Sequence, residues 1–320
     1  MMTASVNQTY WRGLDLLKFI LAFFIVATHC RLSEECPAVK GVLDVLFSMA
    51  VPLYFAISSY LFTRRLDSLD DDRKPDLLKH YLLRLAILFC TWYILSLPAT
   101  LNLWWKVATP KETVYALFLG CTARGYWFIK VLGINLTLLF LCRRKKLFVL
   151  LTIFSVLVFF VFAFNYVFHL FSYPYSPYYS FYYHLGFCCM GVWFARKPQM
   201  LHQLEQHSGY LAIGWLLLFT AAVVWMPLRP LFLLLSLILV FPCFSRESQG
   251  KDLRNLRHIS TFVYMSQFLV IYYYDRLFEG TQSFLTLSPV RFSIVTVLCL
   301  TLASASLALE HRFPVLKYLR

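Results

Sequence analysis

Charged residues are scarce in this sequence. They make up 14% of its 320 residues, with 16 acidic side chains against 30 basic ones. A soluble domain is ordinarily about a quarter charged and about half apolar, whereas here 60% of the residues are hydrophobic and 18% are aromatic. The apolar runs recur along the whole length, and the mean hydropathy is +0.64. The composition therefore excludes an ordinary soluble globular protein and predicts a polytopic membrane protein.

Other features are missing as well. The nine cysteines show no metal-ligand spacing, so no metal site is predicted, and buried cysteines usually act as small hydrophobic residues. One disulfide among Cys30, Cys36 and Cys121 remains an alternative, if these residues face the oxidising side of the membrane. We find no long linker, no internal repeat and no small-residue cleavage site after the first apolar run. We expect one integral-membrane domain over residues 1–320, with no separate soluble domain.

The apolar runs predict an all-α fold, a bundle of about ten transmembrane helices, at about 20 residues per span. The expected spans are 14–31, 41–63, 79–103, 113–120 continuing through 127–142, 147–168, 183–196, 209–226, 228–245, 258–278 and 289–310.

The basic residues gather in alternate loops. With a cytoplasmic N-terminus, the loops on that side hold Arg64, Arg65, Arg73, Lys74, Lys79, Arg143, Arg144, Lys145, Lys146, Arg196, Lys197, Arg246, Lys251, Arg254 and Arg257. Cytoplasmic loops carry such an excess of lysine and arginine. The pattern predicts both termini inside a bacterial cytoplasmic membrane. It also accounts for the formal net charge of +14 without nucleic acid as a partner.

The first span, LDLLKFILAFFIVATHC, carries three ionisable residues, Asp15, Lys18 and His29. Such residues in a membrane helix are costly and usually line a cavity or a pathway. Lys18 and His29 are eleven positions apart, so a helix places them on one face about 16 Å apart. Taken singly, Lys18 could snorkel to lipid phosphates and His29 could be an interfacial histidine. Their shared face favours one polar path.

Three further segments carry polar residues at span ends. SMAVPLYFAISSYLF contains Pro52, which is expected to kink the second span, and Ser59, which either packs helices closely or meets substrate. KHYLLRLAILF places Lys79 and Arg84 at the start of the third span, where they bind anionic phosphates or simply anchor the helix. Glu310 ends the last span and needs a cationic partner.

These segments together resemble a known family. The order LD-x-x-K…H, VPLYFAISSYLF, YWFIKVL, FCCMGVWFARK, RHISTFVYMSQFLV and LALEHRFP is similar to that of acyltransferase family 3. These are bacterial integral-membrane O-acyltransferases of surface polysaccharides. The resemblance covers nearly the whole chain, and its strength lies in the series of motifs.

The resemblance implies a ten-helix core in which cytoplasmic acyl-CoA donates its acyl group to a sugar hydroxyl. Lys18 stands at the family's arginine position, His29 at its essential histidine, Trp127 at its tryptophan and Glu310 at its late acidic residue. Lys18 keeps the positive charge but lacks the guanidinium fork.

Two positions depart from the family pattern. The first arginine of its R-x-x-R pair is replaced by Tyr81, and Arg84 is the second. In the late S-x-x-x-Y-x-x-H pattern, Ser260 and Tyr264 are kept while Gln267 replaces histidine. Glutamine can hydrogen-bond a substrate but cannot take a proton at neutral pH.

The resulting hypothesis is an enzyme with no permanently bound cofactor and with acetyl-CoA, or another acyl-CoA, as its donor. His29 is the expected general base, with Glu310 in support. Asp15, Lys18, Lys79, Arg84, Trp127, Ser59, Tyr264 and Gln267 are the expected substrate-binding residues. The acceptor is expected to be a surface or lipid-linked glycan in exopolysaccharide biosynthesis, with polysaccharide-assembly proteins as partners. Two alternatives remain: a flippase of a lipid-linked glycan, and an inactive scaffold in polysaccharide assembly.

Overall fold

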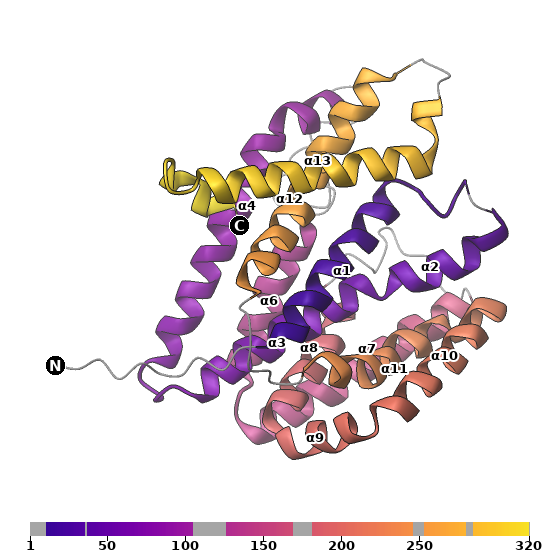
Figure 1. The fold of residues 1–320 in the computed structure, drawn as a ribbon. Coiled ribbons are helices and arrows are strands. Elements are labelled where there is room, and N and C mark those ends of the chain that lie inside the picture. The colour runs from indigo at the N-terminus through magenta and orange to yellow at the C-terminus, as the bar shows by residue number, and fades with distance from the viewer. Residues whose placement is uncertain are drawn as a thin grey trace.

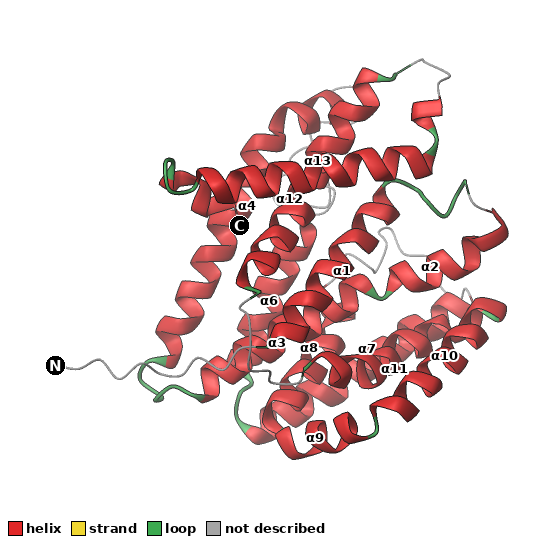
Figure 2. Ribbon diagram, in the orientation of Figure 1, coloured by secondary structure: helices red, strands yellow, loops and turns green. Residues whose placement is uncertain are grey.

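The structure is a computed structural model that describes residues 11–35, 37–104, 126–168, 181–245, 253–279 and 284–319. Within these ranges the secondary structure is helical, with no strand, as Figure 2 shows. The all-α prediction is confirmed. The helices are α1 (Arg12–His29), α2 (Lys40–Ser48), α3 (Ala50–Asp67), α4 (Lys74–Trp104), α6 (Trp127–Leu141), α7 (Lys145–Phe168), α8 (Phe181–Arg196), α9 (Pro198–Gln206), α10 (Ser208–Val224), α11 (Arg229–Phe244), α12 (Arg254–Leu277) and α13 (Ser288–Leu309).

Most of the helix ranges expected from the sequence match these bounds to within a few residues. The first part of the fourth expected span, 113–120, lies outside the described residues. The residues between the expected spans 183–196 and 209–226 form a further short helix, α9, which meets α10 at an angle of 81°. Nine residues with only a few apolar positions are too short to be recognised as a span.

Hydropathy supports a membrane location. Within the described ranges, the helices long and apolar enough to cross a membrane are Pro37–Asp67, Lys74–Ala99, Lys145–Asn165, Met226–Phe244 and Ser288–Leu309. The bent pair of α9 and α10 passes the same test together, and Trp127–Leu141 is a shorter apolar helix. The chain is thus an all-α polytopic membrane protein, while the count of ten spans stays a prediction.

The second span is interrupted where the sequence suggested a kink. Helix α2 ends at Ser48 and α3 begins at Ala50, which places Pro52 in the first turn of α3. A proline ring clashes with the carbonyl four residues earlier and has no N–H to donate. Ser48 occupies that earlier position, and its hydroxyl donates to the Val45 carbonyl at 2.6 Å. The helix is thus interrupted at Met49, three residues before the proline, while Pro37–Asp67 as a whole is long and apolar enough to be one span.

Helices α3 and α8 share the most extensive helix–helix contact among the described residues. Gly191 of α8 lies against α3 so closely that an added Cβ would stand 2.2 Å from both the Ala56 carbonyl oxygen and the Ser59 Oγ. Small residues allow this approach between membrane helices. Tyr60 of α3 packs edge-on against Trp11 at 5.7 Å, and Tyr54 reaches Lys18, about two turns further along α1, so α1 and α3 run antiparallel.

Figure 1 shows α1 and α3 between two groups of helices. Helices α4, α12 and α13 lie on one side, and α7 to α11 lie on the other. Helix α1 packs against α3, α11, α12 and α13, which makes it the central element. We call the side of the bundle at the start of α1 the Arg12 side and the side at its end the His29 side.

A glycine substitution tests the α3–α8 contact. We expect Gly191→Ala to destabilise the protein by about 1–3 kcal/mol, because the added methyl group meets backbone that cannot move away. The measurement is the thermal unfolding midpoint of the detergent-purified protein. Gly209→Ala is the matched control, since no atom lies within 4 Å of its added Cβ. Equal melting temperatures for the two variants would contradict the close packing.

Candidate functional site

The candidate site lies along the contact between α1 and α12. Asp15 and Arg257 are 4.0 Å apart near the start of both helices. The rings of His29 and Phe268 lie 4.5 Å apart further along both. The two helices therefore run parallel, with polar groups at several levels. We call this contact the α1–α12 seam and include in it Asp15, Lys18 and His29 from α1 and Arg257, Ser260, Tyr264, Gln267 and Phe268 from α12.

The Arg12 end of the seam is positively charged. Asp15 is only 3% exposed, and its carboxylate pairs with Arg257. The ammonium group of Lys18 interacts electrostatically with Asp15, Arg257 and Arg84. Lys18 and Arg257 thus lie near the Asp15 carboxylate, and Arg84 lies within electrostatic range of Lys18. Three cations against one carboxylate leave an excess of positive charge, which attracts an anionic ligand. We call Lys18, Arg84 and Arg257 the cationic mouth.

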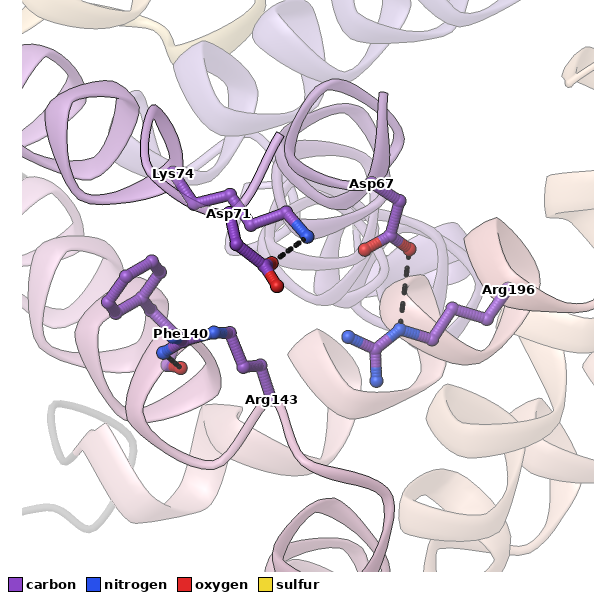
Figure 3. Close-up of polar contacts among 6 residues, drawn as sticks. All are labelled: Asp67, Asp71, Lys74, Phe140, Arg143 and Arg196. Carbon is purple, nitrogen blue, oxygen red and sulfur yellow. Dashed lines mark hydrogen bonds and ion pairs between the residues drawn. The ribbon is translucent and has the colours of Figure 1, made fainter. Parts of the chain in front are cut away.

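Several of the described basic loop residues lie on this same side. Arg64 stands over the Trp11 ring at 5.7 Å, which places the end of α3 beside the start of α1. Figure 3 shows Arg196, at the end of α8, reaching Asp67 at 3.4 Å. It also shows Arg143, beyond α6, near the loop that precedes α4. The charge asymmetry predicted from the sequence is thus an asymmetry of the folded bundle.

One loop carboxylate partly offsets this charge. Lys74 donates a hydrogen bond to Asp71 at 2.7 Å, and this bond, with the charge of Lys74, holds the pKa of the Asp71 carboxyl below its usual value. Asp71 is fully solvated, so its electrostatic effect is screened. The Asp71 carboxylate therefore has a weaker electrostatic effect on the cationic mouth than the buried Asp15 carboxylate.

Tyr54 of α3 closes the middle of the seam. Its hydroxyl donates to the Lys18 carbonyl at 2.6 Å and interacts with the Ser260 side chain. The Tyr264 ring lies 6.0 Å from Tyr54 and 5.5 Å from Phe128. The predicted residue Tyr264 is therefore at the seam, held by aromatic neighbours from α3 and α6.

Gln267 is fully buried one turn beyond Tyr264. Its Nε2 donates to the Tyr264 carbonyl at 3.0 Å, which fixes the orientation of the amide because a carbonyl can only accept. Oε1 is then a buried acceptor with no hydrogen-bond partner among the described residues. Such a group costs about 1–3 kcal/mol when left unpaired. The amide can accept one hydrogen bond from a ligand or a water molecule.

His29 ends α1 and is partly buried. Its ring is tilted by 57° to that of Phe268, and Phe268 also packs edge-on against Tyr126 at 6.2 Å. The imidazole therefore stands among α1, α6 and α12. Lys18 and His29 both meet α12, as their shared helix face predicted.

Trp127 lies on α6 beside this region. It is buried, with its ring 5.2 Å from His184 and 6.4 Å from Phe55. His184 is itself fully buried and stacks on Phe55 at 4.5 Å. His184 carries no signal in the sequence, because one histidine in an aromatic run gives no pattern.

The remaining predicted residues lie away from the seam. The Ser59 hydroxyl bonds to the carbonyls of its own helix, at 3.0 Å from Phe55 and from Ala56, where Gly191 meets α3. Lys79 is exposed and lies about 140° around α4 from Arg84. Glu310 is the C-cap residue of α13 and is half-buried. Their functional roles stay predictions.

Arg257 is the functional candidate that the sequence analysis missed. It was counted only among the basic loop residues, yet it contacts the buried carboxylate of Asp15. Its spacing offered a signal: Arg257, Ser260 and Tyr264 follow one another at i, i+3 and i+7, which is one helix face. No cluster of three His, Cys, Asp or Glu side chains in the described residues could hold a metal ion. Cys30 is a buried free thiol, and Cys36 and Cys121 lie outside the described residues.

The unpaired acceptor of Gln267 leads to a stability prediction. We expect Gln267→Leu to unfold at the same or a higher temperature than the parent protein, because it removes a buried acceptor without a donor. Tyr54→Phe should instead lower the free energy of unfolding by about 1 kcal/mol, because it deletes a made hydrogen bond. Thermal unfolding of both variants decides the matter. An equal loss of stability in the two would show that Oε1 is satisfied.

Most of the chain matches one known protein family. A family model described as an acyltransferase domain, Acyl_transf_3, matches residues 11–308. No curated protein and no solved structure matches the chain significantly. The match includes the whole seam, whereas Glu310 lies just beyond it. The resemblance expected from the motifs is therefore confirmed: the chain belongs to acyltransferase family 3 and is a membrane acyltransferase by family.

Proposed function

We propose that the protein transfers an acyl group, expected to be acetyl, from cytoplasmic acyl-CoA to a hydroxyl group of a surface or lipid-linked glycan. One observation carries the proposal: the α1–α12 seam has the cationic mouth at one end and His29 at the other. These are the two groups that such a reaction needs, a phosphate binder and a base.

The donor would bind at the cationic mouth. Acyl-CoA carries phosphate groups, which pair with lysine and arginine through charge-assisted hydrogen bonds. Arg84 and Arg257 supply two guanidinium groups there, and Lys18 supplies an ammonium group close to Asp15. The pantetheine arm would then extend along the seam toward His29, a path of about 16 Å along α1. Tyr264 and Gln267 line this path, and Gln267 Oε1 can accept a hydrogen bond from a pantetheine amide.

The chemical step follows from the position of His29. The imidazole would take the proton from the acceptor hydroxyl, and the hydroxyl oxygen would attack the thioester carbon. The carbon–sulfur bond then breaks, and coenzyme A leaves as a thiolate that is protonated by His29 or by solvent. Histidine suits this role because its ordinary pKa of about 6.5 leaves it mostly neutral at pH 7 and able to accept a proton. Gln267 cannot share that task, so one base would serve the reaction.

The proposal also assigns the two sides of the membrane. Loops rich in lysine and arginine face the cytoplasm, so the Arg12 side is the cytoplasmic side of a bacterial inner membrane. The donor then reaches the mouth from the cytoplasm, and His29 stands toward the opposite surface, where the glycan is available. Trp127 would form part of the wall near His29, and Glu310 would balance cationic charge at the cytoplasmic side.

The alternative function is that of a flippase, because polar groups inside the bundle could also line a path for a lipid-linked glycan. Incubating the purified protein with labelled acetyl-CoA separates the two functions. Hydrolysis of acetyl-CoA or transfer of the label supports the enzyme. Movement of a lipid-linked glycan across a vesicle membrane without acylation supports the flippase. If neither acyl transfer nor glycan movement is observed, the inactive scaffold is supported.

The first mutational test addresses the base. We expect His29→Ala to reduce acyl transfer by at least about a hundredfold, because general base catalysis contributes 10²–10⁴, while the protein still accumulates in the membrane. Acyl transfer is measured as glycan acylation per amount of protein. His202→Ala is the control, since His202 is an exposed histidine of α9 away from the seam. Full activity of His29→Ala would remove the mechanism.

The second test addresses the donor site. Arg84→Ala should weaken acyl-CoA binding about tenfold, as expected for the loss of one charge-assisted contact, with the acceptor dependence unchanged. The affinity is measured by calorimetry on the purified protein. Arg144→Ala removes the same type of side chain from an exposed loop on the same side. Equal affinities for both variants would argue against the cationic mouth as the donor site.

A further inference from the structure

Helix α12 continues beyond the level of His29 with one ordered face. Phe268, Tyr272 and Asp275 follow one another at i, i+4 and i+7, so they lie within about 60° of each other around the helix. Phe268 is the residue that packs on the His29 ring. Tyr272 therefore lies one turn beyond this contact and Asp275 two turns, about 10 Å further along the axis. We call these three residues the α12 stripe.

Asp275 is held by a partner from the next helix. Its Oδ2 pairs with an Arg291 guanidinium nitrogen at 2.5 Å, and the side chains are 51% and 14% exposed, respectively. Arg291 belongs to the first turn of α13, so the pair ties together the His29-side ends of two helices. The buried Arg291 Nε has no hydrogen-bond partner among the described residues.

The pair stands beside the end of α1. Cys30, which directly follows His29, lies within electrostatic range of both Arg291 and Asp275. Arg31 also acts electrostatically on Asp275. The charged pair and the imidazole are thus neighbours in space as well as on one path along α12.

The stripe offers two kinds of group that bind sugars: a hydrogen-bond acceptor and an aromatic surface. An ionised carboxylate accepts hydrogen bonds through both oxygens, and Arg291 occupies one oxygen, which leaves a half-exposed acceptor held in a fixed direction. Tyr272 adds an aromatic surface with a polar tip. Aromatic faces cover the C–H face of a pyranose ring, while a carboxylate binds its adjacent hydroxyls.

We propose that the α12 stripe is the acceptor subsite: Asp275 binds two neighbouring hydroxyls of a sugar, Tyr272 covers its apolar face, and a further hydroxyl is directed to His29. The inference rests on the proposed acyl transfer and adds the class of ligand and the residues that hold it. The stripe opens on the side opposite the cationic mouth, so donor and acceptor approach His29 from opposite ends.

The test separates the acceptor step from the donor step. We expect Asp275→Asn to lower glycan acylation in cells at least tenfold per amount of protein, with the acyl-CoA affinity of the purified protein unchanged. Asp67→Asn is the matched control, because it removes the carboxylate of another exposed Asp–Arg pair between two helices, Asp67–Arg196, far from the stripe, and should leave acylation at the parent level. Full acylation by Asp275→Asn overturns the proposal.

A charge swap excludes a purely structural role for the pair. The double variant Asp275→Arg with Arg291→Asp keeps an ion pair between α12 and α13 but moves the carboxylate off the stripe. We expect it to accumulate normally and to stay at least tenfold low in acylation. Recovery of parental acylation would mean that only the ion pair matters, and the subsite would be rejected. If the parent protein itself neither binds nor consumes acyl-CoA, the proposed function fails, which is a different outcome from a parent that does both and an Asp275 variant that is unaffected.

Discussion

The parallel packing of α1 against α12 is the contact on which the rest of the site depends. Polar groups inside a membrane helix are expensive unless they meet partners or water. The Asp15 carboxylate is only 3% exposed, and it meets the guanidinium group of Arg257 across this contact. The same contact brings Phe268 to His29. One helix pair thus compensates a buried charge at one end and positions an imidazole at the other.

Tight packing elsewhere allows this polar contact to exist. Gly191 lets α8 approach the backbone of α3, and α3 in turn presents Tyr54 to the seam. The Tyr54 hydroxyl reaches the Lys18 carbonyl, so the spacing between α1 and α3 is set by a hydrogen bond as well as by apolar contact. Dispersion and close approach replace the hydrophobic driving force that water would supply to a soluble bundle.

The sequence predicted what local periodicity controls. Lys18 and His29 were assigned to one face from the helical repeat alone, and the spans followed from hydropathy. Local periodicity could not identify the partner helix, because Arg257 is more than two hundred residues from Asp15 and has the sequence context of an ordinary basic loop residue. Lys79 shows the converse. Its charge beside Arg84 suggested a shared role, yet five helical positions turn the two side chains about 140° apart. Local charge does not reveal which helix face meets the core.

Gln267 shows how function and stability compete within the seam. A buried Oε1 without a donor lowers the stability of the folded protein, and leucine would fit the surrounding apolar core without that cost. Groups of this kind persist where a ligand supplies the missing partner, because the hydrogen bond then forms only when the ligand is bound. The seam therefore contains one buried acceptor, Gln267 Oε1, that no described residue satisfies. A fold stabilised by its outer helices can tolerate such a deficit along its central contact, and that tolerance makes room for a reaction within the membrane.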